Sequence, residues 1–296
     1  MPTFNDLATE LVHRIIECLR DDRNSLRVLS QVSTAFHKPC RRITFSSLVF
    51  TTPRRLGNPK PNSQKLLCLL EAAPELADPE FPAYVTELTI IDGYYELVDD
   101  DSDIATRRPG WLTQDDGFPG ALRMLNLTGL KRLDLRAIWS LITPEAKGLI
   151  ADLCRSPSLV SLRIGEETPL RIINFCGPSL KRLTLGNVDF WSDEEELDGV
   201  QGAPAIKIDY LRLLDNVTDD GSKDMLLQFL SGVVYRIDLS GLKTLSTGSV
   251  LESGTHGIDN YLLSRMGSLE TLSLGPIRVT ETGGFRWYSV LQCPYY

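Results

Sequence analysis

Leu-Lys-Arg-Leu-Asp-Leu at residues 130–135 is the most informative phrase of this chain, because close copies of it recur. The clearest copies are Leu-Val-Ser-Leu-Arg-Ile, Leu-Lys-Arg-Leu-Thr-Leu and Leu-Glu-Thr-Leu-Ser-Leu. Strong and weak copies together occupy residues 85–90, 130–135, 159–164, 180–185, 208–213, 234–239 and 269–274. In each copy the last two apolar residues lie on one side of a short strand, since side chains alternate along a strand. One such unit cannot bury its apolar side alone, so the repetition predicts a stack of strands.

The intervals between the copies are long enough to hold helices. The closing apolar residues lie 21 to 45 positions apart, and the short end of that range is typical of leucine-rich repeats. Thr143, Pro144 and Glu145 form a helix start, with a capping hydroxyl followed by a proline in the first turn. Further helices are predicted in residues 63–76, 222–230 and 258–266, whereas residues 111–119 are predicted to form an inserted loop.

The fold class predicted from this pattern is α/β. Strand–turn–helix units would form an irregular leucine-rich-repeat solenoid with a parallel sheet on its concave face. An ordinary α/β sheet is the alternative.

The first 50 residues carry a different pattern, with apolar residues at helical spacing in 7–19 and again in 26–36. We expect the second of these helices to end at Pro39, since proline interrupts helical hydrogen bonding. A unit this small cannot bury all its apolar side chains by itself. The pattern therefore indicates an apolar surface that docks a partner.

This N-terminal pattern resembles an F-box over about a sixth of the chain. Leu7, Glu10 and Leu11 match its opening, although Ala8 stands where the family usually has proline. The Val32–Ser33 pair before an aromatic residue matches its end. The resemblance implies a three-helix module that binds a Skp-family adaptor. The adaptor-binding residues that it implies are Leu7, Leu11, Ile15, Leu19, Leu29, Val32 and Phe36.

Taken whole, the chain resembles the fungal F-box proteins that carry irregular leucine-rich repeats. The expected domains are an F-box in residues 1–50, a linker in 51–62 and a repeat domain in 63–296. The resemblance implies the substrate-recognition subunit of a Skp–cullin–F-box (cullin–RING) E3 ubiquitin ligase, which holds a target near the ubiquitin donor. One alternative is a repeat scaffold with a degenerate F-box and no ubiquitin role. Another is a small-molecule receptor with a pocket lined by Trp111, Trp139 or Trp191.

The remaining residues favour a non-catalytic protein of the cytoplasm and/or nucleus. Three scattered histidines, with no nucleophile elbow and no phosphate-binding loop, predict no catalytic residue, metal or cofactor. A net charge of −8 argues against nucleic acid as the partner, and no apolar run is long enough to span a membrane. Six cysteines without a Cys-x-x-Cys pair, behind an N-terminus without signal-peptide features, predict reduced intracellular thiols.

Arginines are concentrated on the exposed side of the predicted strands, where they alternate with the buried residues. The arginine fork grips carboxylate or phosphate with two hydrogen bonds, so this surface is predicted to bind an acidic or phosphorylated protein target. Alternatively, the arginines keep an exposed sheet hydrated and pair with Asp134 and Asp238. The predicted target-binding residues are Arg132, Arg136, Arg163, Arg182, Arg212 and Arg236.

Overall fold

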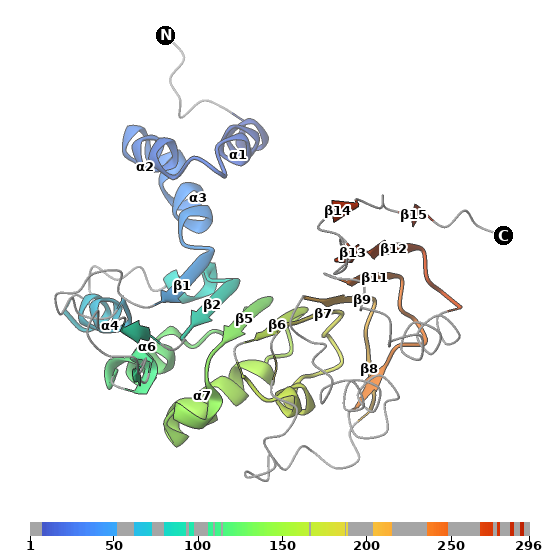
Figure 1. Cartoon of the computed structure of the whole chain (residues 1–296). Helices are drawn as coiled ribbons and strands as arrows, with labels where there is room; N and C mark the ends of the chain where they lie inside the picture. Colours follow the sequence, from blue (N-terminus) through green and yellow to red (C-terminus); the bar gives the residue numbers. More distant parts are fainter. Residues whose placement is uncertain are drawn as a thin grey trace.

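A nine-stranded sheet organises the chain, with the strand order β1-β2-β5-β6-β7-β9-β11-β12-β15 in this computed structural model (Figure 1). The structure describes residues 8–51, 62–72, 80–92, 95–97, 106–108, 110–113, 115–165, 167–186, 188, 204–214, 236–247, 267–274, 277–278, 285–286 and 291–292. The first eight strands are parallel to their neighbours, and β15 pairs antiparallel with β12. Spatial order follows chain order, so each strand lies beside the one before it. The predicted α/β class is confirmed.

The strands are short and regularly placed. Those of the main sheet are β1 (Ser47–Thr51), β2 (Glu87–Ile91), β5 (Arg132–Arg136), β6 (Ser161–Gly165), β7 (Arg182–Leu185), β9 (Tyr210–Leu213), β11 (Thr244–Thr247), β12 (Thr271–Leu274) and β15 (Leu291–Gln292). Three separate ladders pair β3 (Tyr95–Leu97) with β4 (Thr106–Arg108), β8 (Ile206–Lys207) with β10 (Ile237–Asp238), and β13 (Ile277–Arg278) with β14 (Phe285–Arg286).

The repeated phrase produces one buried and one accessible side of this sheet. Leu133 and Leu135 of β5 are buried, and Leu133 is in register with Leu88 of β2 and Leu162 of β6. Asp134, between the two leucines, lies on the accessible side. The same alternation in the neighbouring strands joins their leucines into one continuous core.

Helices cover the buried side of the sheet. The strands follow an arc, and α4 (Asn62–Ala72), α6 (Gly117–Leu125) and α7 (Pro144–Cys154) lie on its outer side (Figure 1). Short 3-10 turns complete this layer: η2 (Trp111–Thr113), η3 (Trp139–Leu141) and η4 (Leu170–Phe175). Since burial of apolar side chains is the main favourable contribution to folding, this layer is what holds the short strands together.

Helix α7 begins where the sequence predicts. The Thr143 hydroxyl accepts a hydrogen bond from the Ala146 N–H at 3.3 Å, and Pro144 occupies the first turn. We expect Thr143→Ala to lower the free energy of unfolding by about 1 kcal/mol, because one N–H at the helix start loses its partner. Urea titration measures this loss. Thr143→Ser keeps the cap, so its free energy of unfolding should stay close to that of the wild type. Equal losses in the two variants would contradict this role.

Three helices precede the sheet: α1 (Thr9–Cys18), α2 (Arg23–Val32) and α3 (Thr34–Thr44). They extend from the β1 end of the sheet, on the side opposite to α6 and α7 (Figure 1). Their own core consists of Val12, Ile16, Leu26, Phe36 and Cys40. We call these helices the N-terminal module.

The end of the second helix differs from the prediction. Helix α2 stops at Val32, and Ser33 adopts an extended conformation and caps α3 through the Ala35 N–H at 3.2 Å. Pro39 lies inside α3, so it does not end the helix before it. The early break is explained by the serine cap, which starts a new helix at once.

A short helix joins the N-terminal module to the sheet. In α5 (Phe81–Tyr84), Phe81 packs edge-to-face against Phe45 with ring centroids 5.2 Å apart. Lys38 and Glu80 form an exposed ion pair at 2.6 Å beside this contact. The module is thus attached through aromatic packing near β1. Residues 47–50, which the sequence prediction placed in the F-box, belong to β1 and pair with β2.

Two further predictions are wrong, one about the sheet and one about residues 111–119. In the copy at 234–239, the described residues 236–239 do not supply a strand of the main sheet, because β10 pairs with β8 in a separate ladder. The strand beside β9 is instead β11, in which Leu245 is buried and Thr247 replaces the closing leucine of the phrase. Residues 111–119 hold η2 and the start of α6, with Trp111 and Phe118 buried, where an inserted loop was predicted.

Other predictions concern parts of the chain outside the described residues. They include the predicted helices in residues 222–230 and 258–266 and most of the predicted linker. Leu7 and Trp191 also lie outside the described ranges.

Candidate functional site

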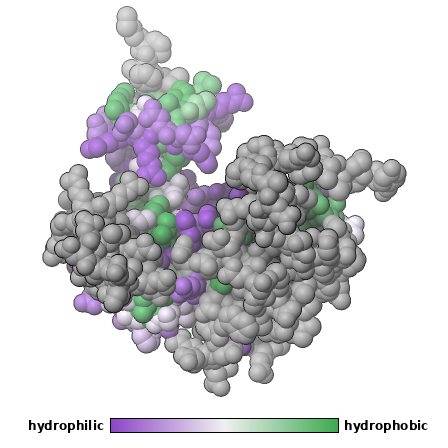
Figure 2. Space-filling model, viewed as in Figure 1, coloured by the Kyte–Doolittle hydropathy of each residue, from purple (hydrophilic) through white to green (hydrophobic). Residues whose placement is uncertain are grey.

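Four aliphatic side chains of the N-terminal module are exposed although the module has its own core. Leu11 and Ile15 of α1 are 49% and 38% exposed, and Val28 and Val32 of α2 are 61% and 55% exposed. Each pair is spaced four residues apart, so each forms a stripe on one face of its helix. Figure 2 shows hydrophobic residues in green on the outside of this module. We call the four residues the apolar helix surface.

The predicted adaptor-binding residues divide between this surface and the core. Leu11, Ile15 and Val32 belong to the apolar helix surface, whereas Leu19 and Leu29 are partly buried against the core. Phe36 is completely buried inside the module and forms no part of its surface. Val28 was missed, although its four-residue spacing from Val32 was the available signal.

The accessible side of the main sheet is the second candidate site, and we call it the open sheet face. Strand register places its side chains in two rows that cross the strands. The first row, in strand order from β2, is Glu87, Arg132, Ser161, Arg182, Tyr210, Thr244 and Thr271. The second row is Thr89, Asp134, Arg163, Thr184, Arg212, Ser246 and Ser273.

Carboxylates engage the arginines of β5. Arg132 contacts Glu87 at 2.9 Å, and Arg136 grips Asp134 with two hydrogen bonds of 3.0 Å each. The Arg136–Asp134 pair is local pairing that the alternative interpretation predicts, whereas the partner of Arg132 is Glu87, which that interpretation did not name. Arg163 on β6 reaches the same Asp134 only at 3.7 Å, which is longer than a hydrogen bond.

Farther along the open sheet face the arginines have different surroundings. The guanidinium of Arg182 lies over the ring of Tyr210, 4.6 Å from its centroid, in a cation–π contact that holds Arg182 in place. Arg212 on β9 is exposed, and no residue within the described ranges forms an ion pair with it. Tyr210 was missed as a site residue because its role depends on the neighbouring strand, which sequence spacing does not specify.

Arg236 does not belong to the open sheet face. It precedes β10, outside the main sheet, and its guanidinium donates to the backbone oxygens of Asn174 at 3.0 Å and Pro204 at 2.7 Å. The physical reason is that β10 pairs with β8, so the described residues 236–239 do not extend the rows of the main sheet. Arg236 connects η4 to the segment before β8, which is a structural role.

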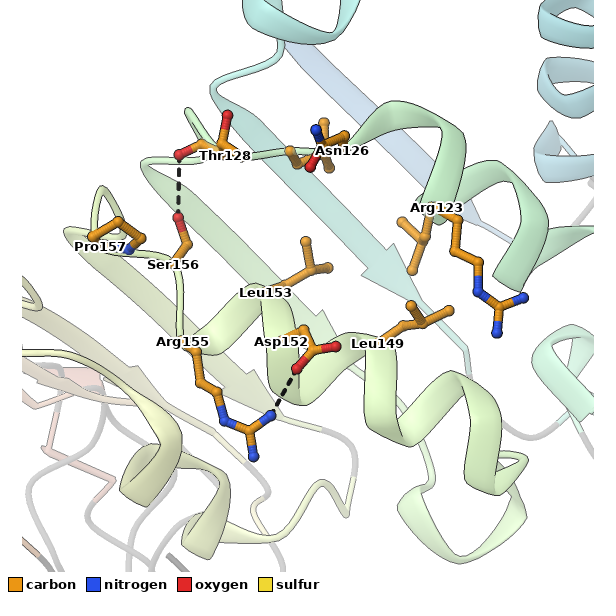
Figure 3. Close-up of a pocket in the computed structure, with 11 residues that line it drawn as sticks. Arg123, Asn126, Thr128, Leu149, Asp152, Leu153, Arg155, Ser156 and Pro157 are labelled. Atoms are coloured by element: carbon orange, nitrogen blue, oxygen red, sulfur yellow. Dashed lines mark hydrogen bonds and ion pairs between the residues drawn. The ribbon is translucent and has the colours of Figure 1, made fainter. Parts of the chain in front are cut away.

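A groove of about 350 Å³ lies between α6 and α7 on the outer side of the arc (Figure 3). Its apolar lining includes Leu149 and Leu153. At its rim Arg155 donates to Asp152 at 2.7 Å, and the Thr128 carbonyl accepts a hydrogen bond from a serine hydroxyl (Figure 3). Because these polar groups already have partners, the groove offers a mainly apolar surface.

Asp92 is a buried acid at the end of β2. It is fully buried, and neither carboxylate oxygen has a hydrogen bond of good geometry to any described residue. Burial raises the pKa of Asp92 to about 6, although the backbone N–H groups of Trp111 and Leu112 act in the opposite direction. A buried acid with a raised pKa is a feature that functional sites share, and buried structural acids share it too.

Within the described ranges, no three histidine, cysteine, aspartate or glutamate side chains are placed to hold a metal ion. None of the described helices is long and apolar enough to cross a membrane. Trp111 and Trp139, named for a possible ligand pocket, are both buried in the core and do not line the groove between α6 and α7. No family model, curated protein or solved structure matches the chain.

Proposed function

We propose that this chain is the substrate-recognition subunit of a Skp–cullin–F-box (cullin–RING) ubiquitin ligase in the cytoplasm and/or nucleus. In this proposal the N-terminal module is an F-box and binds a Skp-family adaptor. The sheet and its helices form an irregular leucine-rich-repeat solenoid, which holds an acidic or phosphorylated protein target on the open sheet face.

The apolar helix surface is the observation that carries this proposal. The module buries Val12, Ile16, Leu26, Phe36 and Cys40 in its own core, so the four exposed aliphatic residues are additional to what its folding needs. Exposed aliphatic stripes are costly to maintain in water, and their burial against a partner releases that cost. A docking role accounts for exposed aliphatic stripes on both α1 and α2, which pack against α3.

The proposed role requires no chemistry from this chain. Binding the adaptor and the target at the same time raises the effective concentration of target lysines near the ubiquitin donor. The two candidate surfaces support such a role because they lie on different elements: the apolar helix surface on α1 and α2, and the open sheet face on the strands.

The test is capture of a purified Skp-family adaptor by the full chain. We expect the double variant Leu11→Asp, Ile15→Asp to reduce the affinity at least tenfold, because carboxylates would then be buried in an apolar contact. Isothermal titration and co-purification with the adaptor measure this loss.

Met124→Asp is the matched control, since Met124 is an exposed apolar residue of α6, 43% exposed and outside the module. It should bind the adaptor as the wild type does. Helical circular dichroism of each variant should also match the wild type, which shows that the module is still folded. Failure of the wild-type chain to bind the adaptor would overturn the proposal and favour a repeat scaffold with no ubiquitin role.

A further inference from the structure

The middle of the open sheet face differs from the rest of that face in charge. Strands β6, β7 and β9 carry Arg163, Arg182 and Arg212 there, and the other members of their rows are Ser161, Thr184 and Tyr210. None of these described residues is acidic. In a chain of net charge −8, three arginines on adjacent strands are a local concentration of positive charge.

Strand register brings the three arginines around one hydroxyl group. Arg163 and Arg212 flank Thr184 in the same row, and Arg182 lies two residues before Thr184 on β7. Because adjacent strands are about 4.8 Å apart, the backbones at Arg163 and Arg212 are separated by about 10 Å. Long side chains from both sides can therefore reach a group placed over Thr184.

These arginines keep binding capacity that the β5 arginines have already used. Arg136 donates two hydrogen bonds to Asp134, while Arg163 approaches that carboxylate only at 3.7 Å. The contact of Arg182 with Tyr210 is made with an aromatic ring, 4.6 Å from its centroid, and occupies no carboxylate.

We propose that Arg163, Arg182 and Arg212 form a subsite for a phosphate monoester, carried by a protein segment and placed over Thr184. The proposal rests on the proposed function for the identity of the bound molecule as a protein target. It narrows the target-binding arginines to three and assigns the chemistry that they recognise. Arg132 and Arg136 serve the face by pairing with Glu87 and Asp134.

Phosphate fits this subsite better than carboxylate does. A carboxylate is satisfied by one arginine fork, as Asp134 is by Arg136 in this structure. A phosphate monoester carries nearly two negative charges at neutral pH and three acceptor oxygens, so it can use several guanidinium groups together. Three arginines on adjacent strands therefore exceed what one glutamate needs and suit one phosphorylated side chain.

The neighbouring strands specify the sequence around the phosphorylated residue. Beyond β9, the rows continue with Thr244 and Ser246 on β11 and with Thr271 and Ser273 on β12. These short hydroxyl side chains are neutral and can exchange hydrogen bonds with a polar segment. The bound segment is thus expected to carry one phosphorylated residue followed or preceded by small polar residues.

The experiment uses the full chain and three fluorescent peptides with the same glycine–serine sequence. Their central residue is phosphoserine, glutamate or serine, and binding is measured by fluorescence anisotropy. We expect the phosphoserine peptide to bind at least tenfold more tightly than either other peptide. Arg163→Gln, Arg182→Gln and Arg212→Gln should each weaken its binding about tenfold.

Arg132→Gln is the matched control, because Arg132 lies on the same face but is paired with Glu87. It should change the affinity less than twofold. Equal binding of the phosphoserine and glutamate peptides, or an equal loss in Arg132→Gln, would overturn the subsite. Equally tight binding of single-stranded RNA or of vesicles containing phosphatidylserine would also overturn it, since a general cationic surface would then explain the result.

Tyr210 provides a second measurement that does not remove a charge. Tyr210→Phe keeps an aromatic ring under Arg182 and should keep the affinity, whereas Tyr210→Ala removes the ring and should weaken binding several-fold.

Adaptor capture tests the proposed function separately, because the apolar helix surface lies outside the sheet. Loss of phosphopeptide binding with normal adaptor capture would therefore reject the subsite alone, and the reverse result would reject the ligase role alone.

Discussion

The Phe36→Ala variant is expected to unfold the N-terminal module. Phe36 is completely buried among Val12, Ile16, Leu26 and Cys40, and removal of a buried phenylalanine side chain costs about 3–5 kcal/mol. A module of this size has little stability to lose, because a small unit buries a small fraction of its surface. Loss of helical circular dichroism and a lower unfolding midpoint in urea are the measurements.

Val32→Ala is the control for Phe36→Ala. Val32 is 55% exposed, so its truncation should change the free energy of unfolding by at most about 0.5 kcal/mol. Equal stability of the two variants would show that Phe36 is not the centre of the module's core.

Phe36→Ala and the Leu11→Asp, Ile15→Asp double variant separate two reasons for losing the proposed adaptor binding. Phe36→Ala should lose it together with its helical signal, because the docking surface is then no longer formed. The Leu11→Asp, Ile15→Asp variant should lose it with the helical signal intact, because those side chains lie outside the core. A residue can thus match a motif and still act only through folding.

Sequence periodicity was sufficient for the strands that carry the full phrase. In residues 130–135 the apolar positions are all occupied by leucine, and the structure buries Leu130, Leu133 and Leu135. Because side chains alternate along a strand, the burial of Leu133 and Leu135 decides which side of β5 faces the core. The residues on its accessible side could therefore be predicted as well. For this reason Arg132, Arg136, Arg163, Arg182 and Arg212 all lie where the sequence places them.

Periodicity failed where strand pairing depends on the rest of the fold. Residues 234–239 match the phrase better than residues 242–247, which end in Thr247, yet the latter form β11 of the main sheet. Pairing is decided by which strand can complete the ladder beside β9, and a hexapeptide pattern carries no information about that. Arg236 was assigned to the wrong surface for this reason.

The segment around Trp111 shows a second limit. Glycines and Pro119 between residues 110 and 120 are typical of a loop, but the ring centroids of Trp111 and Phe118 lie 5.7 Å apart in an edge-to-face contact, and Phe50 packs on both. Tertiary burial of these aromatic side chains outweighs weak local helix propensity. The sequence prediction placed Phe50 in the F-box, which is a separate domain from residues 111–119. The contact of Phe50 with Trp111 and Phe118 could therefore not be predicted.

This aromatic cluster also creates the environment of Asp92. The indole N–H of Trp111 donates to the Ile91 carbonyl at 2.8 Å, which fixes residues 110–113 against the end of β2. A Cβ at Gly110 would overlap the carboxyl group of Asp92, so a glycine is required there. Asp92 is consequently enclosed without a well-formed hydrogen bond from the described residues, and its charged form is disfavoured.

The free energy of unfolding should therefore fall as Asp92 ionises. Burial raises its pKa from the ordinary value of 3.8 to about 6. Between these two values the unfolded chain has released the proton while the folded chain still holds it, so rising pH favours unfolding. Since a tenfold change in proton affinity corresponds to about 1.4 kcal/mol, the total loss is about 3 kcal/mol and is complete above pH 6.

Asp92→Asn removes this ionisation and keeps the shape of the side chain. We expect its stability, measured in urea titrations from pH 4 to pH 8, to gain on the wild type by about 3 kcal/mol up to pH 6 and then to run parallel. Asp22→Asn is the control of opposite sign. Hydrogen bonds from Ser25 lower the pKa of Asp22, so that carboxylate stabilises the fold above its ordinary pKa, and this contribution disappears as the pH falls. A constant difference between Asp92→Asn and the wild type over the whole range would mean that Asp92 is ionised throughout and that the end of β2 supplies it with a partner.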